Sequence, residues 1–167
     1  GLELDASIPF LQKWMLMPNL ALSTNKNTNF TTYAGGELVS LGKTDIAFSP
    51  EIVASNMIIF QPNNKVSLGL LSKYVGQQYM GNIDSEASKL DSYFVHDFNA
   101  SYHLGNAWIF ESLAFNLVVN NIFDVEYVSN GYFYTYDDTW SVPGEITTIE
   151  TPGYYPQAEI NFLFGIT

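Results

Sequence analysis

The sequence predicts an all-β fold, an antiparallel up-and-down transmembrane β-barrel segment that supplies about seven strands of a larger barrel. The first observation is a period-two alternation of apolar and polar residues along stretches of about ten residues, the length of a tilted strand that crosses a bilayer. The second is composition, because 47% of the residues are hydrophobic and only 14% are charged, too few to cover an ordinary soluble surface. No stretch reaches the roughly 18 uninterrupted apolar residues of a membrane helix.

The alternation gives each predicted strand one face of large apolar side chains and one face that is mostly polar or small. Near the C-terminus, for example, Ile160, Phe162 and Phe164 share one face, while Glu159 and Asn161 share the other. In a membrane barrel the apolar face contacts lipid and the polar face lines a watery interior. The strands are expected at residues 2–8, 14–23, 52–60, 66–74, 94–104, 113–120 and 156–167.

The connections between these strands alternate between short and long. Short turns fall at residues 10–13, 62–65 and 105–106, and long connections at residues 24–50, 80–90 and 124–153. Outer-membrane barrels have short periplasmic turns and longer extracellular loops, so we place the short turns in the periplasm and the long connections outside the cell. Bacterial single-chain barrels have an even number of strands, and an open sheet edge is costly in lipid. Seven strands therefore indicate an incomplete barrel.

A late segment of the chain carries a family resemblance. Residues 120–127 read N-N-I-F-D-V-E-Y, which resembles the N-N-[LI]-F-D-x-x-Y signature of TonB-dependent outer-membrane receptors. Residues 129–132, 154–158 and 161–167 resemble, in the same order, that family's last extracellular loop and final strand. Residues 49–51, 73–79 and 90–93 are similar to its preceding strands. Family members usually end two or three residues later with an aromatic residue, so we expect that the chain either is truncated at Thr167 or continues in a tail beyond it.

The resemblance implies a function for the parent protein. Residues 1–167 would be the C-terminal part of a TonB-dependent receptor barrel in the cell outer membrane, with the plug domain and the N-terminal strands absent. The full receptor would import a scarce nutrient, such as a ferric siderophore or similar chelate, cobalamin or an oligosaccharide. Its partners would be outer-membrane lipid, the transported ligand, and the TonB energy-coupling complex acting through the missing plug. The resemblance implies neither an enzyme nor a cofactor.

The long connection at residues 124–153 concentrates aromatic side chains near two carboxylates. Aromatic loops above a barrel mouth are suited to capturing a ligand. For the motif before this loop a structural role is favoured, with Asn120 and Asn121 satisfying backbone groups and with Phe123 and Tyr127 in the interfacial aromatic girdle. The predicted ligand-binding residues are Tyr132, Tyr134, Tyr136, Asp137, Asp138 and Trp140.

Several other classes of function have little support. The net charge is −11 and all six basic residues are lysines, which opposes binding to nucleic acid phosphates. The absence of cysteine rules out a thiolate metal site. His96 and His103 lie an odd number of residues apart on one predicted strand, so they face opposite sides and cannot form a pair. Asp137-Asp138-Thr139 lacks the spacing of a calcium loop, and no helix follows Gly35-Gly36 to make a phosphate site.

Two alternatives remain open at this stage. A soluble lipocalin-like barrel would use the alternating faces to line an internal apolar pocket, and it would need a polar exterior. A small complete outer-membrane barrel with an adhesive or structural role would need an even number of strands and both termini in the periplasm.

Overall fold

The computed structural model describes residues 1–105 and 109–167. Asn106, which the sequence places in a short turn, lies outside these described residues. The secondary structure consists of strands and one short 3-10 helix, η1 (Glu86–Ser88). The strands are β1 (Leu2–Asp5), β2 (Ile8–Phe10), β3 (Trp14–Leu22), β4 (Lys26–Ala34), β5 (Glu37–Asp45), β6 (Ile52–Asn63), β7 (Val66–Val75), β8 (Gln78–Tyr79), β9 (Lys89–Leu90), β10 (Tyr93–His103), β11 (Ala114–Asn120), β12 (Val128–Asp138), β13 (Thr147–Pro156) and β14 (Asn161–Ile166).

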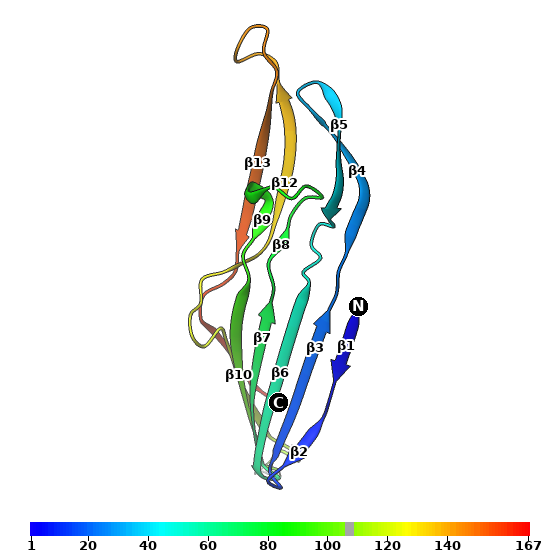
Figure 1. Ribbon diagram of the computed structural model, residues 1–167. Helices are drawn as coiled ribbons and strands as arrows, with labels where there is room; N and C mark the ends of the chain where they lie inside the picture. The colour runs from blue at the N-terminus through cyan, green and yellow to red at the C-terminus, as the bar shows by residue number, and fades with distance from the viewer. Residues whose placement is uncertain (106–108) are drawn as a thin grey trace.

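The main sheet runs in the order β1-β3-β6-β7-β10-β11-β14, and every pairing in it is antiparallel. Its strands follow chain order, as an up-and-down barrel segment requires, so the predicted fold class is confirmed (Figure 1). The first predicted strand is divided into β1 and β2, which pair with opposite ends of β3. Within the described residues β1 and β14 lie at the two edges, so the sheet is open.

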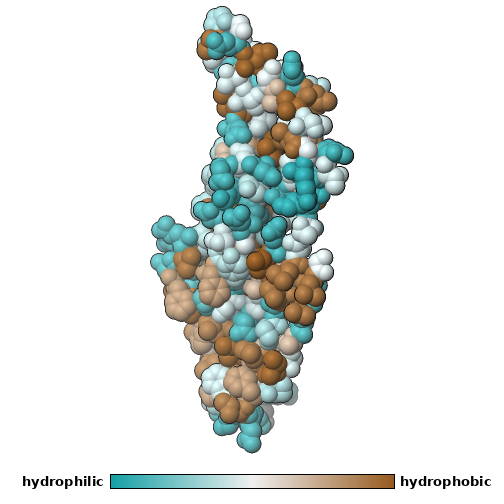
Figure 2. Space-filling view, viewed as in Figure 1, coloured by the Kyte–Doolittle hydropathy of each residue, from teal (hydrophilic) through white to brown (hydrophobic). Residues whose placement is uncertain are grey.

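The cross-strand register places apolar residues opposite one another on one face of the sheet. Ile58, Leu70 and Phe98 form one such row across β6, β7 and β10. The side chains of this row are half-buried, and others on the same face are exposed, with Phe94 at 51% and Phe162 at 74%, because no second layer of the described chain covers them. Figure 2 shows hydrophobic residues concentrated over the lower part of the molecule, where this sheet lies.

The two fully described short turns agree with the sequence prediction. Leu11 and Gln12 adopt positive φ between β2 and β3, and the side chain of Asn63 accepts hydrogen bonds from the backbone of Lys65 and Val66 between β6 and β7. Both turns lie at the end of the molecule opposite the long connections (Figure 1). The strand predicted at residues 156–167 is shorter than expected, because Pro156 belongs to β13 and β14 covers only Asn161–Ile166.

The long connections contain more regular structure than the sequence indicated. Residues 24–50 include the hairpin β4–β5, and residues 124–153 include β12 and most of β13. Both hairpins rise above the main sheet (Figure 1). Their Thr, Tyr and Phe residues favour strands, a preference that the surrounding Gly, Asn and Asp residues mask in the sequence. No helix in the described part of the chain is long and apolar enough to cross a membrane.

Candidate ligand-binding loop crown

Three long connections meet above the sheet, and we call residues 24–50, 80–90 and 124–153 together the loop crown. Asp137 joins the tips of the two hairpins of the crown, β4–β5 and β12–β13. The two carboxylate oxygens of Asp137 accept hydrogen bonds from the backbone N–H groups of Gly35, at 3.1 Å, and Gly36, at 2.7 Å. The hydroxyl of Thr148 donates to Asp137 at 2.7 Å and accepts from the Gly35 N–H at 2.8 Å. We call these four residues the tip latch.

The backbone of the turn makes this contact possible. Gly35 and Gly36 have φ values of +64° and +82°, a region that residues with a Cβ seldom adopt. Successive N–H groups in such a turn form a concave site for an anion. The Thr148 hydroxyl, and then the Gly36 N–H, lower the pKa of Asp137 by stabilising its charged form.

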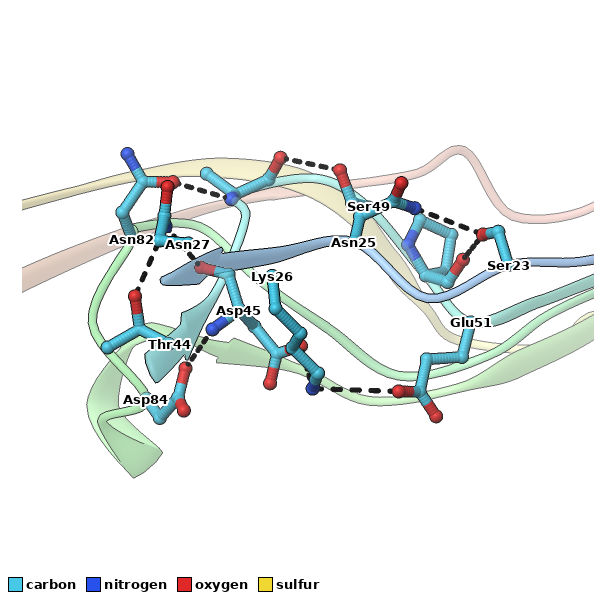
Figure 3. A network of polar contacts seen from close by, with 12 residues as sticks. Ser23, Asn25, Lys26, Asn27, Thr44, Asp45, Ser49, Glu51, Asn82 and Asp84 are labelled. Atoms are coloured by element: carbon cyan, nitrogen blue, oxygen red, sulfur yellow. Dashed lines mark hydrogen bonds and ion pairs between the residues drawn. The ribbon is translucent and has the colours of Figure 1, made fainter. Parts of the chain in front are cut away.

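A polar network holds the base of the β4–β5 hairpin (Figure 3). Lys26 is hydrogen-bonded to Asp45 and lies 3.5 Å from a carboxylate oxygen of Glu51. The hydrogen bond to Asp45 is the main cause that raises the pKa of Lys26. Asn82 and Asp84, from the 80–90 connection, accept hydrogen bonds from the backbone of Ala47 and Asp45, each at 2.8 Å. The hairpin is therefore anchored at its base as well as at its tip.

The 80–90 connection also contacts the β12–β13 hairpin. The hydroxyl of Ser85 donates to Glu150 at 2.7 Å, and the hydroxyl of Tyr154 donates to the carbonyl of Ala87 at 3.1 Å. The two segments also pack closely, since a Cβ on Gly81 would lie 2.7 Å from the ring of Phe133 on β12. The three connections thus form one continuous unit.

An exposed row of aromatic rings follows the β12 strand, and we call it the aromatic ladder. Alternate residues Tyr132, Tyr134 and Tyr136 share a face, with neighbouring ring centroids 6.2 and 6.3 Å apart. Trp140, beyond the strand, continues the row 6.0 Å from Tyr136, in nearly parallel planes. All four side chains keep between 41% and 68% of their surface exposed, so the row is open to solvent.

The structure brings together four of the six predicted site residues and gives the two carboxylates separate surroundings. Tyr132, Tyr134, Tyr136 and Trp140 form the ladder, with exposed fractions from 41% to 68%. Asp137 belongs to the tip latch. Asp138 accepts hydrogen bonds from the backbone of Trp140 and Ser141, both at 3.0 Å, within its own hairpin. Ligand contact by these six residues stays a prediction.

Sequence reasoning missed two parts of the loop crown. The sequence argues against a phosphate site at Gly35-Gly36 and indicates no other role, whereas the pair forms a hairpin turn whose N–H groups bind a carboxylate of another hairpin. The role of Thr148 could not be predicted, because nothing in its local sequence indicates a hydrogen bond to Gly35, which lies more than a hundred positions away. The glycine pair was the available signal, since it can present two N–H groups to an anion.

The N-N-I-F-D motif forms a turn that is held by one buried side chain. The side chain of Asn121, which is 4% exposed, both donates to the carbonyl and accepts from the N–H of Val125, at 2.9 Å each. Its own N–H donates to Asp97 on β10, and the carboxylate of Asp124 accepts from the N–H of Ile160, each at 2.8 Å. The amide of Asn121 satisfies backbone groups, in agreement with the structural role favoured for this motif.

Comparisons with known proteins find no relative by sequence, but they find similar structures. No family model and no curated protein matches the sequence. Solved structures do match. The siderophore receptor PiuA from Acinetobacter baumannii matches at 16% identity and a TM-score of 0.61. The ferric-catecholate import receptor Fiu from E. coli K12, in its open form, matches at 16% identity and a TM-score of 0.57. The chain has the fold of a receptor barrel segment.

These matches cover nearly all of this chain but only a small part of each receptor. They span 99% of this chain for PiuA and 98% for Fiu, but only 21% and 19% of the receptors themselves. A mutant of the ferric enterobactin receptor PfeA from Pseudomonas aeruginosa, in complex with enterobactin, matches at 15% identity and a TM-score of 0.52, over 98% of this chain and 22% of that one. The chain therefore spans about a fifth of the length of these receptors. All three are receptors rather than enzymes.

Proposed function

We propose that residues 1–167 are the C-terminal part of the barrel of a TonB-dependent transporter in the outer membrane, and that a ferric chelate is its ligand. The observation that carries the proposal is the match of nearly the whole chain to three siderophore receptors. Cobalamin and an oligosaccharide, which the sequence resemblance also allows, have no similar support. The energy-coupling complex would act through a plug that precedes residue 1 in the full receptor.

The exposed apolar face of the sheet supports a membrane location. Side chains such as Phe162 and Phe164, at 74% and 62% exposure, would be unfavourable in water, whereas hydrocarbon accommodates them. A lipocalin-like soluble module would instead pack this face inside, and it is not favoured. The open sheet likewise does not favour a small complete barrel, which needs a closed ring of strands.

The loop crown supports a capture role at the outer mouth. Its three connections are linked by hydrogen bonds, so they can act as one cover above the barrel interior. The aromatic ladder combines exposed aromatic surface with tyrosine hydroxyl groups, which suits a ligand that carries both polar and apolar surface. In this proposal the ladder binds the chelate first, and the polar inner face of the sheet forms part of the passage.

Growth and uptake experiments on the full-length gene product test this function. Cells that lack other ferric-chelate receptors should grow in iron-limited medium with ferric enterobactin only when the protein is present. Parallel cultures would test a ferric hydroxamate, cobalamin and a maltooligosaccharide. Uptake of neither ferric chelate, whether or not cobalamin or the maltooligosaccharide is taken up, would contradict the proposed ligand. Recovery of the protein as a compact monomer without detergent would contradict the membrane location.

A ladder variant tests the binding site itself. Tyr134→Ala removes the central ring and should weaken binding of the transported ligand by roughly fivefold, since aromatic contacts contribute about 1 kcal/mol each. Tyr33→Ala is the matched control, because Tyr33 is a crown tyrosine, 69% exposed, that lies on β4 outside the ladder. Equal affinity of both variants and the parent would exclude the ladder from ligand binding.

A further inference from the structure

One polar row crosses the apolar face of the main sheet. Asn56 on β6 pairs with Ser72 on β7, which pairs on its other side with His96 on β10. Residues directly opposite in an antiparallel sheet share a face, so these three side chains lie side by side. The rows on either side, by the same register, are Ala54, Tyr74 and Phe94 toward the crown, and Ile58, Leu70 and Phe98 toward the short turns.

Two atoms of this row lack hydrogen-bond partners. Asn56 Oδ1 and His96 Nδ1 are buried, and neither has a partner within the described chain. The imidazole of His96 is enclosed by the rings of Phe94 and Phe123, with centroids 4.4 and 4.8 Å away. Unpaired polar atoms are costly in an apolar environment, so polar groups on such a face are usually matched by a ligand or partner.

The position of the row identifies its surroundings. Tyr74 and Phe94, with ring centroids 6.5 Å apart, and the 65% exposed Phe123 lie on the crown side of the row. Aromatic residues of membrane barrels gather at the level of the lipid head groups. The polar row lies two residues further along the strands, at most about 7 Å deeper. That depth corresponds to the ester and amide linkages that join lipid head groups to acyl chains.

We propose that Asn56, Ser72 and His96 bind the acyl-linkage region of an outer-membrane lipid. The amide N–H of Asn56, the hydroxyl of Ser72 and the imidazole N–H are donors that ester or amide carbonyl oxygens accept. The two unpaired atoms are themselves closed off from the surface, so the donor groups of these half-buried side chains are the ones that a lipid meets. The apolar rows beyond Ile58 and Leu70 continue along the direction in which the acyl chains would run, which favours a lipid over a second protein. The inference rests on the proposed membrane location.

Native mass spectrometry of the full-length protein, extracted in a mild detergent, tests the site. The parent protein should retain a bound lipid, and its mass distinguishes a phospholipid from a glycolipid with amide-linked chains. The triple variant Asn56→Leu, Ser72→Ala, His96→Leu should lose that lipid, and each single variant should weaken its retention roughly fivefold. Ser101→Ala, on the opposite face of β10, is the matched control and should retain the lipid.

Three results would overturn the inference, and they can be told apart. Equal lipid retention by the triple variant and the parent would exclude the row while leaving the membrane location intact. A dimer of the parent that dissociates in the triple variant would show that a protein, and not a lipid, covers the row. Failure of the parent to partition into membranes would overturn the proposed function together with this site.

Discussion

The carboxylate of Asp137 binds the backbone N–H of Gly36 at 2.7 Å, although the two residues are 101 positions apart in the chain. This bond joins the tips of two hairpins that belong to separate two-stranded sheets. An isolated two-stranded hairpin is only marginally stable in water. The tip latch therefore supports both hairpins in their positions above the sheet.

Removal of the latch carboxylate should separate the hairpin tips. We predict that Asp137→Ala increases and broadens the distance between spin labels on two introduced cysteines, one near each tip. Residues 1–167 contain no cysteine, so the introduced pair would be the only thiols in this part of the protein. Asp138→Ala is the control, because Asp138 bonds only within its own hairpin turn and should leave this distance unchanged. An unchanged distance in Asp137→Ala would show that the latch does not position the hairpins.

The same contact should respond to acid. The latch lowers the pKa of Asp137 below the ordinary value of about 3.9, so it is fully stable above that pH and is lost as the pH falls through the lower pKa of the folded state. The label distance should stay constant from neutral pH to about pH 4 and increase in stronger acid. In Asp137→Asn the carboxyl that titrates is gone, and a similar acid transition there would assign the effect to another group.

The close packing around Gly131 on β12 and Gly153 on β13 should not tolerate a side chain at either position. A Cβ on Gly153 would lie 2.2 Å from the Tyr132 ring, and one on Gly131 would lie 2.4 Å from the Met80 sulfur. Gly131→Ala should cost about 1–3 kcal/mol by overpacking and accelerate hydrogen exchange in both hairpins. Gly165→Ala, where a Cβ meets nothing within 4 Å, should behave like the parent. Equal exchange in the two variants would contradict this account.

The buried amide of Asn121 should matter more than that of its neighbour. Asn121→Ala leaves the N–H and carbonyl of Val125 unpaired, and we expect a loss of about 2–3 kcal/mol in the free energy of unfolding. Asn120→Ala removes one exposed side-chain bond to Asn161 and should cost less than about 1 kcal/mol. Thermal unfolding in detergent would measure both, and similar losses would refute a special role for this turn.

The main sheet could be predicted because membrane strands repeat a simple local pattern. Phe94, Phe98 and Tyr102 recur at even spacing, and residues such as Asn63 mark a turn by side-chain chemistry alone. The hairpins of the crown were harder to recognise, since Gly, Asn and Asp surround strand-forming residues such as Tyr134. Register in these hairpins depends on contacts with the rest of the crown.

The candidate site was predictable only in part. The alternate spacing of Tyr132, Tyr134 and Tyr136 predicts a shared face once β12 is known to be a strand. The partner of Asp137 could not be predicted, because a hydrogen bond between distant segments leaves no periodic signal in either one. The polar row likewise depends on the register of three strands, which no single strand specifies.

The order of the main sheet also bears on how such proteins could change size in evolution. Each strand bonds to strands that precede and follow it in that order, so duplication or loss of one hairpin would disturb only the two ladders beside it. The circumference of a barrel grows with the number of its strands. A lineage could therefore widen or narrow its pore in steps of two strands while every other pairing is inherited unchanged.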